Sequence, residues 1–267
     1  MSESIELANI SVYFSRAGGD VVPALRRLSL SVEPSEYVTV VGPNGAGKST
    51  LINVLAGSVI PQEGEVFIGN RRVTDMPDFR RSRWVSRVFQ DPTQATCDAL
   101  SVKENLSLAL MRGRGRSPFR LAVDRRRTRQ FQELLAVYGR NLENRLDQEV
   151  GRLSGGERQL LAVIMGVMQE PSVLLLDEHT SALDPHIGAL VMRLTDELVR
   201  KQGLTTIMVT HNMRYAAQFG DRLLIMSGGV IVDDIRADEK RGLTEDSLIR
   251  RFREALAGEL TDRLIGG

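Results

Sequence analysis

Nine residues of the chain, "GPNGAGKST" at 42–50, have the types and the spacing of a phosphate-binding loop. Glycines let the backbone wrap around phosphate oxygens, and the N–H groups that open the following helix face the anion. The pattern places Lys48 for the β- and γ-phosphates and Ser49 for a magnesium ion. We therefore expect a phosphate site formed by Gly42, Pro43, Asn44, Gly45, Ala46, Gly47, Lys48, Ser49 and Thr50.

Two adjacent carboxylates end the apolar run "VLLLDE". A phosphate-binding loop needs a second Mg²⁺ ligand from the end of a neighbouring strand, and Asp177 supplies it. Glu178 is then the candidate general base for an attacking water, a role worth roughly 10²–10⁴ in rate. The alternative is that Glu178 is an ordinary surface carboxylate. For His179 we expect a packing role, and tuning of Glu178 by a nearby charge is the alternative.

The segment "LSGGERQ" at 153–159 predicts a second anion site, because Ser154, Gly155 and Gly156 open an apolar helix. One nucleotide does not need two such sites in the same chain. The simplest arrangement is a dimer in which this segment completes the partner's nucleotide site. The alternative is a serine that only caps its helix.

Alternating strands and helices must position these residues. Apolar, β-branched residues predict buried strands, and Gly57 and Pro171 mark helix ends. The expected fold class is α/β, with an open and mainly parallel sheet. Expected strands are 5–14, 25–32, 36–42, 64–70, 172–177, 205–210 and 222–229, and expected helices are 48–57, 156–170, 185–202 and 212–219, with a helical pattern between 101 and 150.

Composition narrows the function classes. The 267 residues, 42% of them hydrophobic, suffice for one large domain or two small ones. The net charge of +1 gives no field toward nucleic acid, so no nucleic-acid partner is expected. The single Cys97 excludes an internal disulfide. We find no signal-peptide pattern and no apolar run of about 18 residues, so the expected location is the cytosol, at a membrane only through a partner.

These motifs, with Gln90 in "VFQDP", "SALD" at 181–184 and His211 in "VTHN", occur in the order found in the ATP-binding subunits of ABC transporters. The sequence resembles that family over nearly its whole length. The resemblance implies a single ABC ATPase domain of the P-loop NTPase fold, with a RecA-like core and an antiparallel β subdomain. The implied divisions are a core with β subdomain at 1–92 and 169–240, a helical subdomain at 93–168 and a C-terminal helical tail at 241–267.

The resemblance also implies ATP and Mg²⁺ as cofactors and a head-to-tail homodimer that encloses two ATP molecules. By position, Gln90 would contact Mg²⁺ or the water, Asp184 would lie at the dimer interface, and His211 would contact the γ-phosphate. An aromatic residue upstream of the loop would stack on adenine. Phe14 and Tyr13 compete for that role, and the distance to "PALRRLSL" favours Phe14.

"RVFQDPT" and "DEHTSALDP" resemble a bacterial subgroup, the importer ATPases of tryptophan/tyrosine type. That resemblance implies an ATPase at the cytoplasmic face of the membrane. It would power a separate permease supplied by an extracytoplasmic binding protein, for a small solute such as an amino acid. An exporter or lipid-trafficking ATPase is the first alternative, and a soluble ABC ATPase the second. The chain has one motif set and no sustained heptads, which disfavours the second alternative.

Overall fold

The computed structural model describes residues 2–15, 19–112, 125–137 and 141–265, without side chains for 259–265. Its main sheet has six strands in the order β10-β9-β3-β8-β7-β6. Strands β9 to β6 run parallel, and β10 is antiparallel to β9. The prediction of a mainly parallel sheet is confirmed. The bounds are β3 (Tyr37–Val41), β6 (Val85–Val88), β7 (Val173–Asp177), β8 (Thr205–Val209), β9 (Arg222–Ser227) and β10 (Val230–Ile235).

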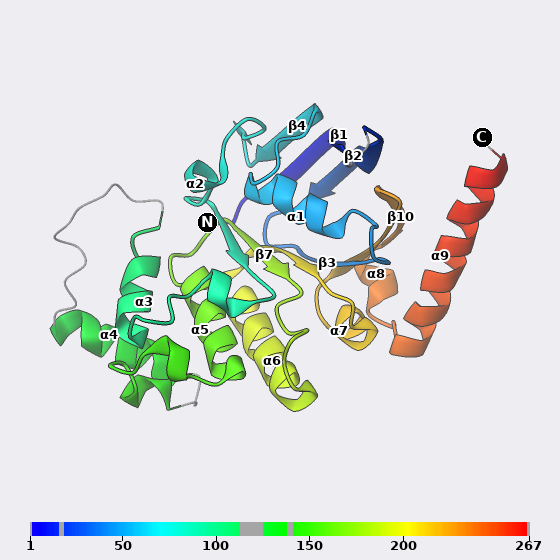
Figure 1. The fold of residues 1–267 in the computed structure, drawn as a ribbon. Coiled ribbons are helices and arrows are strands. Elements are labelled where there is room, and N and C mark those ends of the chain that lie inside the picture. Colours follow the sequence, from blue (N-terminus) through cyan, green and yellow to red (C-terminus); the bar gives the residue numbers. More distant parts are fainter. Residues whose placement is uncertain (1, 16–18, 113–124, 138–140, 266–267) are drawn as a thin grey trace.

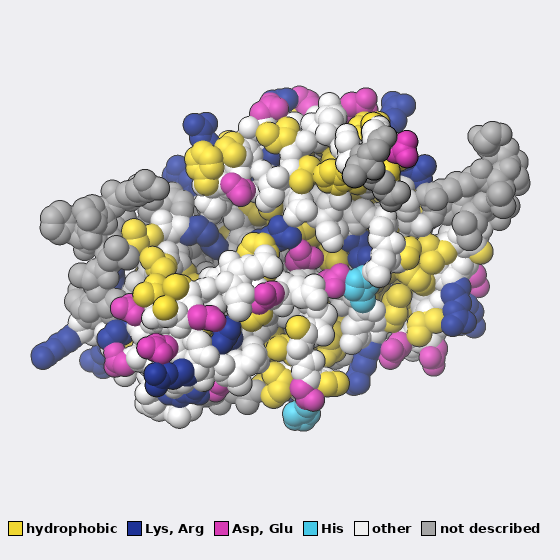
Figure 2. Space-filling view, in the orientation of Figure 1, with side chains coloured by type: hydrophobic (Ala, Val, Ile, Leu, Met, Phe, Trp, Pro, Cys, Tyr) yellow, Lys and Arg dark blue, Asp and Glu magenta, His cyan; other side chains and the backbone are white. Residues whose placement is uncertain are grey.

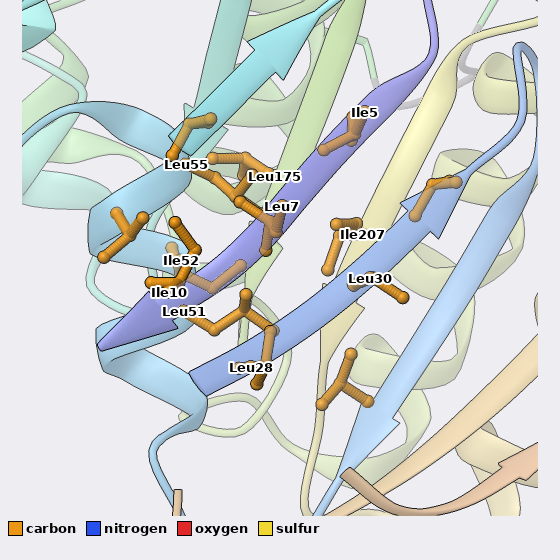
Figure 3. Packing of buried hydrophobic residues seen from close by; sticks show 14 of the residues in the cluster. Ile5, Leu7, Ile10, Leu28, Leu30, Leu51, Ile52, Leu55, Leu175 and Ile207 are labelled. Atoms are coloured by element: carbon orange, nitrogen blue, oxygen red, sulfur yellow. The ribbon is translucent and has the colours of Figure 1, made fainter. Parts of the chain in front are cut away.

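A second, antiparallel sheet has four strands in the order β2-β1-β4-β5. Its apolar face packs on helix α1 (Lys48–Ala56) and on the main sheet. In Figure 3, Leu7 and Ile10 of β1 lie against Leu51 and Ile52 of α1, and these side chains belong to one buried cluster. This sheet therefore helps to fix the helix that follows the phosphate-binding loop. Its strands are β1 (Ile5–Ser15), β2 (Val21–Val32), β4 (Glu63–Ile68) and β5 (Arg71–Arg72).

The helices α3 (Val102–Ala109), α4 (Arg125–Ala136) and α5 (Gly155–Val167) share a separate apolar cluster. They lie together at one end of the molecule (Figure 1). Helix α5 also packs on α6 (Pro185–Gln202), and α6 contributes to a cluster beside the main sheet. The predicted helical pattern between 101 and 150 gives only two α-helices in the described part, and residues 113–124 lie outside the described residues.

The predicted helical tail at 241–267 corresponds to α9 (Glu245–Ile265). Residues 266 and 267 of the tail lie outside the described part of the chain. The helix docks on α7 (Met213–Gln218) and on β9 and β10 through Leu248 and Phe252. An ion pair between Arg251 and Asp233, with Nε and Oδ2 2.6 Å apart, adds to this contact. Helix α8 (Ala237–Lys240) connects β10 to α9. In Figure 1, α9 lies at the opposite end from α3 and α4.

A buried arginine holds the C-terminal end of α1. Arg81, which ends the short helix α2 (Asp78–Arg81), is fully buried and donates to the carbonyls of Val54 at 2.5 Å and Leu55 at 3.1 Å. It also donates to the carbonyls of Thr74 and Met76. Burial lowers the pKa of Arg81 to about 10. The guanidinium thus satisfies carbonyls at the negative end of the α1 dipole.

On the face shown in Figure 2, acidic and basic side chains are interspersed. This distribution agrees with the net charge of +1. Across the residues that the structure describes, no helix is both long enough and apolar enough to cross a membrane.

Candidate functional site

Three neighbouring strands bring the predicted residues to one edge of the main sheet. The phosphate-binding loop follows β3, Asp177 ends β7, and His211 comes two residues after β8. The strand order β3-β8-β7 makes these ends neighbours. Ligands of open α/β sheets bind at such carboxyl edges. The fold therefore gathers the loop, both carboxylates and the imidazole at one place.

A cavity of about 460 Å³ lies at this edge. It joins the loop to Glu178 and His211 and also reaches the antiparallel sheet. Tyr13 does not line it, whereas Phe14 does, and the Phe14 side chain remains 46% exposed. The described residues that line the cavity are Phe14, Val22, Pro23, Ala24, Asn44, Gly45, Ala46, Gly47, Lys48, Ser49, Thr50, Glu178 and His211.

The loop has the conformation that its glycines permit. Gly47 has a φ of 100°, and a Cβ there would lie 2.5 Å from the Ala24 carbonyl oxygen, so only glycine fits. Lys48 is 5% exposed, and its Nζ donates to the carbonyls of Gly42 at 2.8 Å and Pro43 at 2.9 Å. Burial lowers the pKa of Lys48, while the charges of Glu178 and Asp177 act in the opposite direction. These contacts hold the ammonium group of Lys48 against the loop.

Asp177 is engaged by a residue that the sequence did not single out. Arg87 of β6 places its Nη2 2.6 Å from Asp177 Oδ2, and both side chains are largely buried. The hydroxyl of Ser49 makes no hydrogen bond among the described residues and lines the cavity. A hydroxyl and one carboxylate suit Mg²⁺, which keeps several waters and takes phosphate oxygens as further ligands. Within the described residues no cluster of three or more His, Cys, Asp or Glu side chains offers an all-protein metal cage.

Glu178 and His211 form a close pair at the rim of the cavity. His211 Nε2 lies 2.5 Å from Glu178 Oε1, so the imidazole and the carboxylate are in direct contact. Glu178 has a φ of 47°, in the left-handed region, and its N–H donates to the Val209 carbonyl at 3.0 Å. Such a backbone is costly for a non-glycine residue and is found mostly at functional sites. The side chain of Glu178 is 15% exposed and that of His211 43%.

His179 does not line the cavity. Its side chain is buried, and both ring nitrogens lack a hydrogen-bond partner among the described residues. Burial lowers the pKa of His179 to about 4, so the imidazole is neutral at physiological pH. The packing role expected from the sequence agrees with this position.

Eight of the predicted site residues do not line the cavity: Gly42, Pro43, Gln90, Ser154, Gly155, Gly156, Asp177 and Asp184. Gln90 is exposed just after β6, and Ser154 is exposed at the start of α5. Asp184 caps α6 by accepting a hydrogen bond from the backbone N–H of His186 at 2.9 Å. In the single chain, Ser154 therefore lies outside the cavity and Asp184 serves as a helix cap.

The segment 153–159 forms a capping box. The Ser154 Oγ accepts from the Glu157 N–H at 3.3 Å, and the Glu157 carboxylate accepts from the Ser154 N–H at 2.9 Å. Arg145 holds the same carboxylate at 2.5 Å. A Cβ at Gly156 would lie 2.2 Å from Ile187 Cγ2, so this glycine allows α5 to approach α6. Ser154 therefore caps its helix, which is the alternative considered from the sequence. Ser154 and Gly155 are also exposed on the surface.

The comparison with protein families is decisive. The family model described as ABC transporter matches residues 25–181, more than half of the chain. The chain belongs to the ABC transporter family. The match ends before His211, so that residue's role depends on the geometry described above.

Individual relatives of this ABC transporter protein agree. The tyrosine transport ATP-binding protein of Clostridioides difficile is 39% identical over 252 residues, covering 94% of this chain and all of that protein. The thiamine import ATP-binding protein of Chelativorans sp. is 37% identical, covering 83% of each chain. The ATP-binding cassette MJ0796 of Methanocaldococcus jannaschii, solved as a dimer bound to ADP and phosphate, has a TM-score of 0.73. It is 28% identical and covers 87% of this chain and 98% of its own.

Sequence reasoning missed Arg87, the residue that contacts Asp177. Its strand β6 has four residues, "VSRV", and was not predicted. One signal was available: Arg87 lies three residues before Gln90, in the stretch "VSRVFQDP" that runs into the motif containing Gln90. Its contact with Asp177 spans 90 positions, which no local pattern reveals.

Proposed function

We propose that this chain binds and hydrolyses ATP to power a separate membrane permease, and that the transporter imports a small solute such as an amino acid. The Glu178–His211 pair at the rim of the phosphate-loop cavity carries the proposal for hydrolysis. The family supplies the nucleotide and the coupling to transport. The chain would work at the cytoplasmic face of the membrane, held there by the permease.

In the proposed reaction, the loop N–H groups and Lys48 bind the β- and γ-phosphates of ATP. Ser49 and Asp177 would hold Mg²⁺, with Gln90 at its margin, and the ion would neutralise developing phosphate charge. Glu178 accepts the proton of the attacking water. His211 Nε2 lies against that carboxylate and orients it, and the imidazole would contact the γ-phosphate. Phe14 stacks on the adenine ring at the outer end of the cavity.

We further propose that two copies assemble head to tail. At the start of α5, Ser154 and Gly155 are exposed and Gly156 is half-buried, and all three lie outside the cavity of their own chain. A second chain could present them to the γ-phosphate, with Asp184 at the interface. The dimeric state of the MJ0796 cassette supports this arrangement. ATP binding would then close the dimer, and hydrolysis would reopen it.

The importer assignment draws on the relatives. One is named for tyrosine transport and another for thiamine import, and this chain covers all or most of each. An importer would also need an extracytoplasmic binding protein. The ATPase does not contact the transported solute, so the solute class is inferred from these names alone. An exporter or lipid-trafficking role is the alternative.

The hydrolytic role is tested by Glu178→Gln. The variant should keep ATP binding, lose turnover by at least 10²-fold and accumulate as an ATP-bound dimer in size-exclusion chromatography. Glu170→Gln is a matched control, because Glu170 also has a left-handed backbone, with a φ of 49°, but follows α5 at the opposite end of β7. Monomeric Glu178→Gln with ATP, together with near-normal turnover, would refute the role.

The transport role needs the partner proteins. The chain should co-purify with the permease encoded beside it, and the ATPase activity of that complex in vesicles should rise with the liganded binding protein. Screening the binding protein against amino acids and vitamins then names the solute. Efflux of a solute from loaded cells, without any need for a binding protein, would favour the exporter instead.

A further inference from the structure

The carboxylate that the proposed function assigns to Mg²⁺ already has a cation. Arg87 Nη2 lies 2.6 Å from Asp177 Oδ2, while Arg87 Nη1 donates to Asn53 Oδ1 at 2.8 Å. Asn53 lies on α1, one turn beyond Ser49. The guanidinium therefore connects the two elements, α1 and β7, that would supply the protein ligands of the metal.

This guanidinium is only partly satisfied. Its Nε is buried and lacks a hydrogen-bond partner among the described residues. The remaining support is the Phe89 ring, whose centroid lies 4.6 Å from the guanidinium carbon. A buried N–H without an acceptor costs free energy, so this side chain is not locked in a fully bonded position. Asp177 is its only carboxylate partner among the described residues.

Two cations cannot occupy this carboxylate equally well. A divalent ion bound to Asp177 would lie within a few ångströms of the guanidinium, and like charges repel strongly at that distance in a partly buried site. Mg²⁺ also demands near-ideal octahedral geometry, which a competing bidentate-capable donor on the same carboxylate disturbs. The metal and Arg87 are therefore in competition for Asp177.

We propose that Arg87 is a resident counter-cation that occupies Asp177 while the site lacks metal and leaves it when the divalent ion arrives with the nucleotide. The inference rests on the proposed role of Asp177 as a metal ligand. It assigns to Arg87 the control of metal affinity. An ion bound without nucleotide must displace the guanidinium unaided, so metal alone binds weakly.

Space for a displaced Arg87 side chain is present beside β6. Two cavities of about 340 and 270 Å³ open on the side of β6, and Arg87, Phe89 and Arg112 line both. Arg112 is held by Ser86 Oγ at 2.5 Å and the Gly166 carbonyl at 3.0 Å, so it does not depend on a carboxylate. Rotation of Arg87 toward these cavities would free Asp177 without moving the backbone of β6.

The test measures metal binding rather than turnover. Mn²⁺, which replaces Mg²⁺ and is detected by electron paramagnetic resonance, is titrated into the full chain saturated with a non-hydrolysable ATP analogue. Arg87→Met and Arg87→Gln should bind Mn²⁺ about tenfold more tightly than the wild type. Arg87→Lys keeps a cation and should stay within about threefold of wild type. Analogue binding in EDTA should change less than twofold, which checks that the loop is intact.

Arg112→Met is the matched control, since it removes the other arginine of the same cavities. It should leave Mn²⁺ affinity unchanged. An equal gain in Arg112→Met would show a general charge effect and overturn the proposal. So would unchanged or weaker Mn²⁺ binding in both neutral Arg87 variants, which would mean that Arg87 orients Asp177 for the metal instead.

A different result is expected if Asp177 is not a metal ligand. Asp177→Asn should abolish Mn²⁺ binding by the protein, leaving the signal of the free ion, in both the wild-type and the Arg87→Met backgrounds. If Asp177→Asn binds Mn²⁺ normally, the metal role of Asp177 is wrong, and the Arg87 proposal falls with it. If only Asp177→Asn behaves as expected, the site stands and the counter-cation role alone is refuted.

Discussion

His211 Nε2 lies 2.5 Å from Glu178 Oε1 although the two residues follow different strands, β8 and β7. The neighbouring positions of those strands in the sheet bring the side chains together. This contact is the arrangement expected if Glu178 is the base that we propose and His211 is the group that orients it.

Replacing His211 by alanine should lower the rate more than the affinity. The carboxylate loses the donor that orients it, so we expect kcat to fall by roughly 10²-fold. The KM for ATP should change less than threefold, because the loop and Lys48 still bind the phosphates. Steady-state ATPase assays give both constants, and a loss confined to KM would contradict the orienting role.

Ser154 and Ser101 provide a comparison within the chain. Both form capping boxes, on α5 and α3 respectively. Ser154→Ala and Ser101→Ala should each reduce the free energy of unfolding by about 1 kcal/mol. Only Ser154→Ala should also lower ATPase activity, by at least tenfold, if Ser154 completes a nucleotide site across a dimer. Equal activity in the two variants would limit Ser154 to its structural cap.

Phe14→Ala should weaken ATP binding about tenfold, because loss of aromatic stacking on a base costs roughly 1–3 kcal/mol. Tyr13→Ala is the control, since Tyr13 does not line the cavity. Fluorescence titration with a labelled ATP in EDTA measures both. The reverse order of the two effects would assign the adenine contact to Tyr13.

A buried lysine predicts a pH dependence of stability. Lys240 is 4% exposed, and its Nζ donates to the Phe219 carbonyl and, at 3.4 Å, to Thr39 Oγ1. Burial lowers its pKa from 10.5 to about 7, and Asp221, Asp196 and Arg200 are the charges around it. Between these pKa values the unfolded chain binds more protons than the folded one, so stability rises with pH by up to about 1.4 kcal/mol per unit.

That rise should be measured from pH 7 to 9. Above pH 10 the raised pKa of buried Tyr37 acts in the opposite direction, because only the unfolded tyrosine ionises there. Lys240→Met should flatten the slope in urea unfolding, whereas Lys201→Met, which alters an exposed lysine, should retain it. An identical slope in wild type and Lys240→Met would contradict the assignment.

Local patterns predicted the elements that carry strong signals. The apolar runs that became β3 and β7 and the glycine-bounded α1 lie within a residue or two of their expected limits. The short elements β5, β6, α2 and α8 were missed, because two to four residues hold too little periodicity to distinguish them from turns, and β10 was missed as well. The six residues of β10, "VIVDDI", also pair only with β9 and carry two adjacent aspartates.

The placement of Lys48 at the start of α1 and of Asp177 at the end of β7 was predictable, because one residue type at one spacing marks each motif. The pairing of Glu178 with His211 follows from strand order, which a single sequence does not contain. The ion pair between Arg87 and Asp177 and the isolation of the His179 ring depend on packing across the sheet. Such long-range contacts have no local signature.

The arginine that caps α1 has a consequence for folding. Arg81 lies beyond β4 and β5 in the chain, yet its guanidinium binds the last carbonyls of α1. An isolated helix of nine residues is marginal in water. The last carbonyls of α1 can therefore gain these donors only once synthesis has passed Arg81. Residues 48–57 and 74–81 should open and close as one cooperative unit in hydrogen exchange.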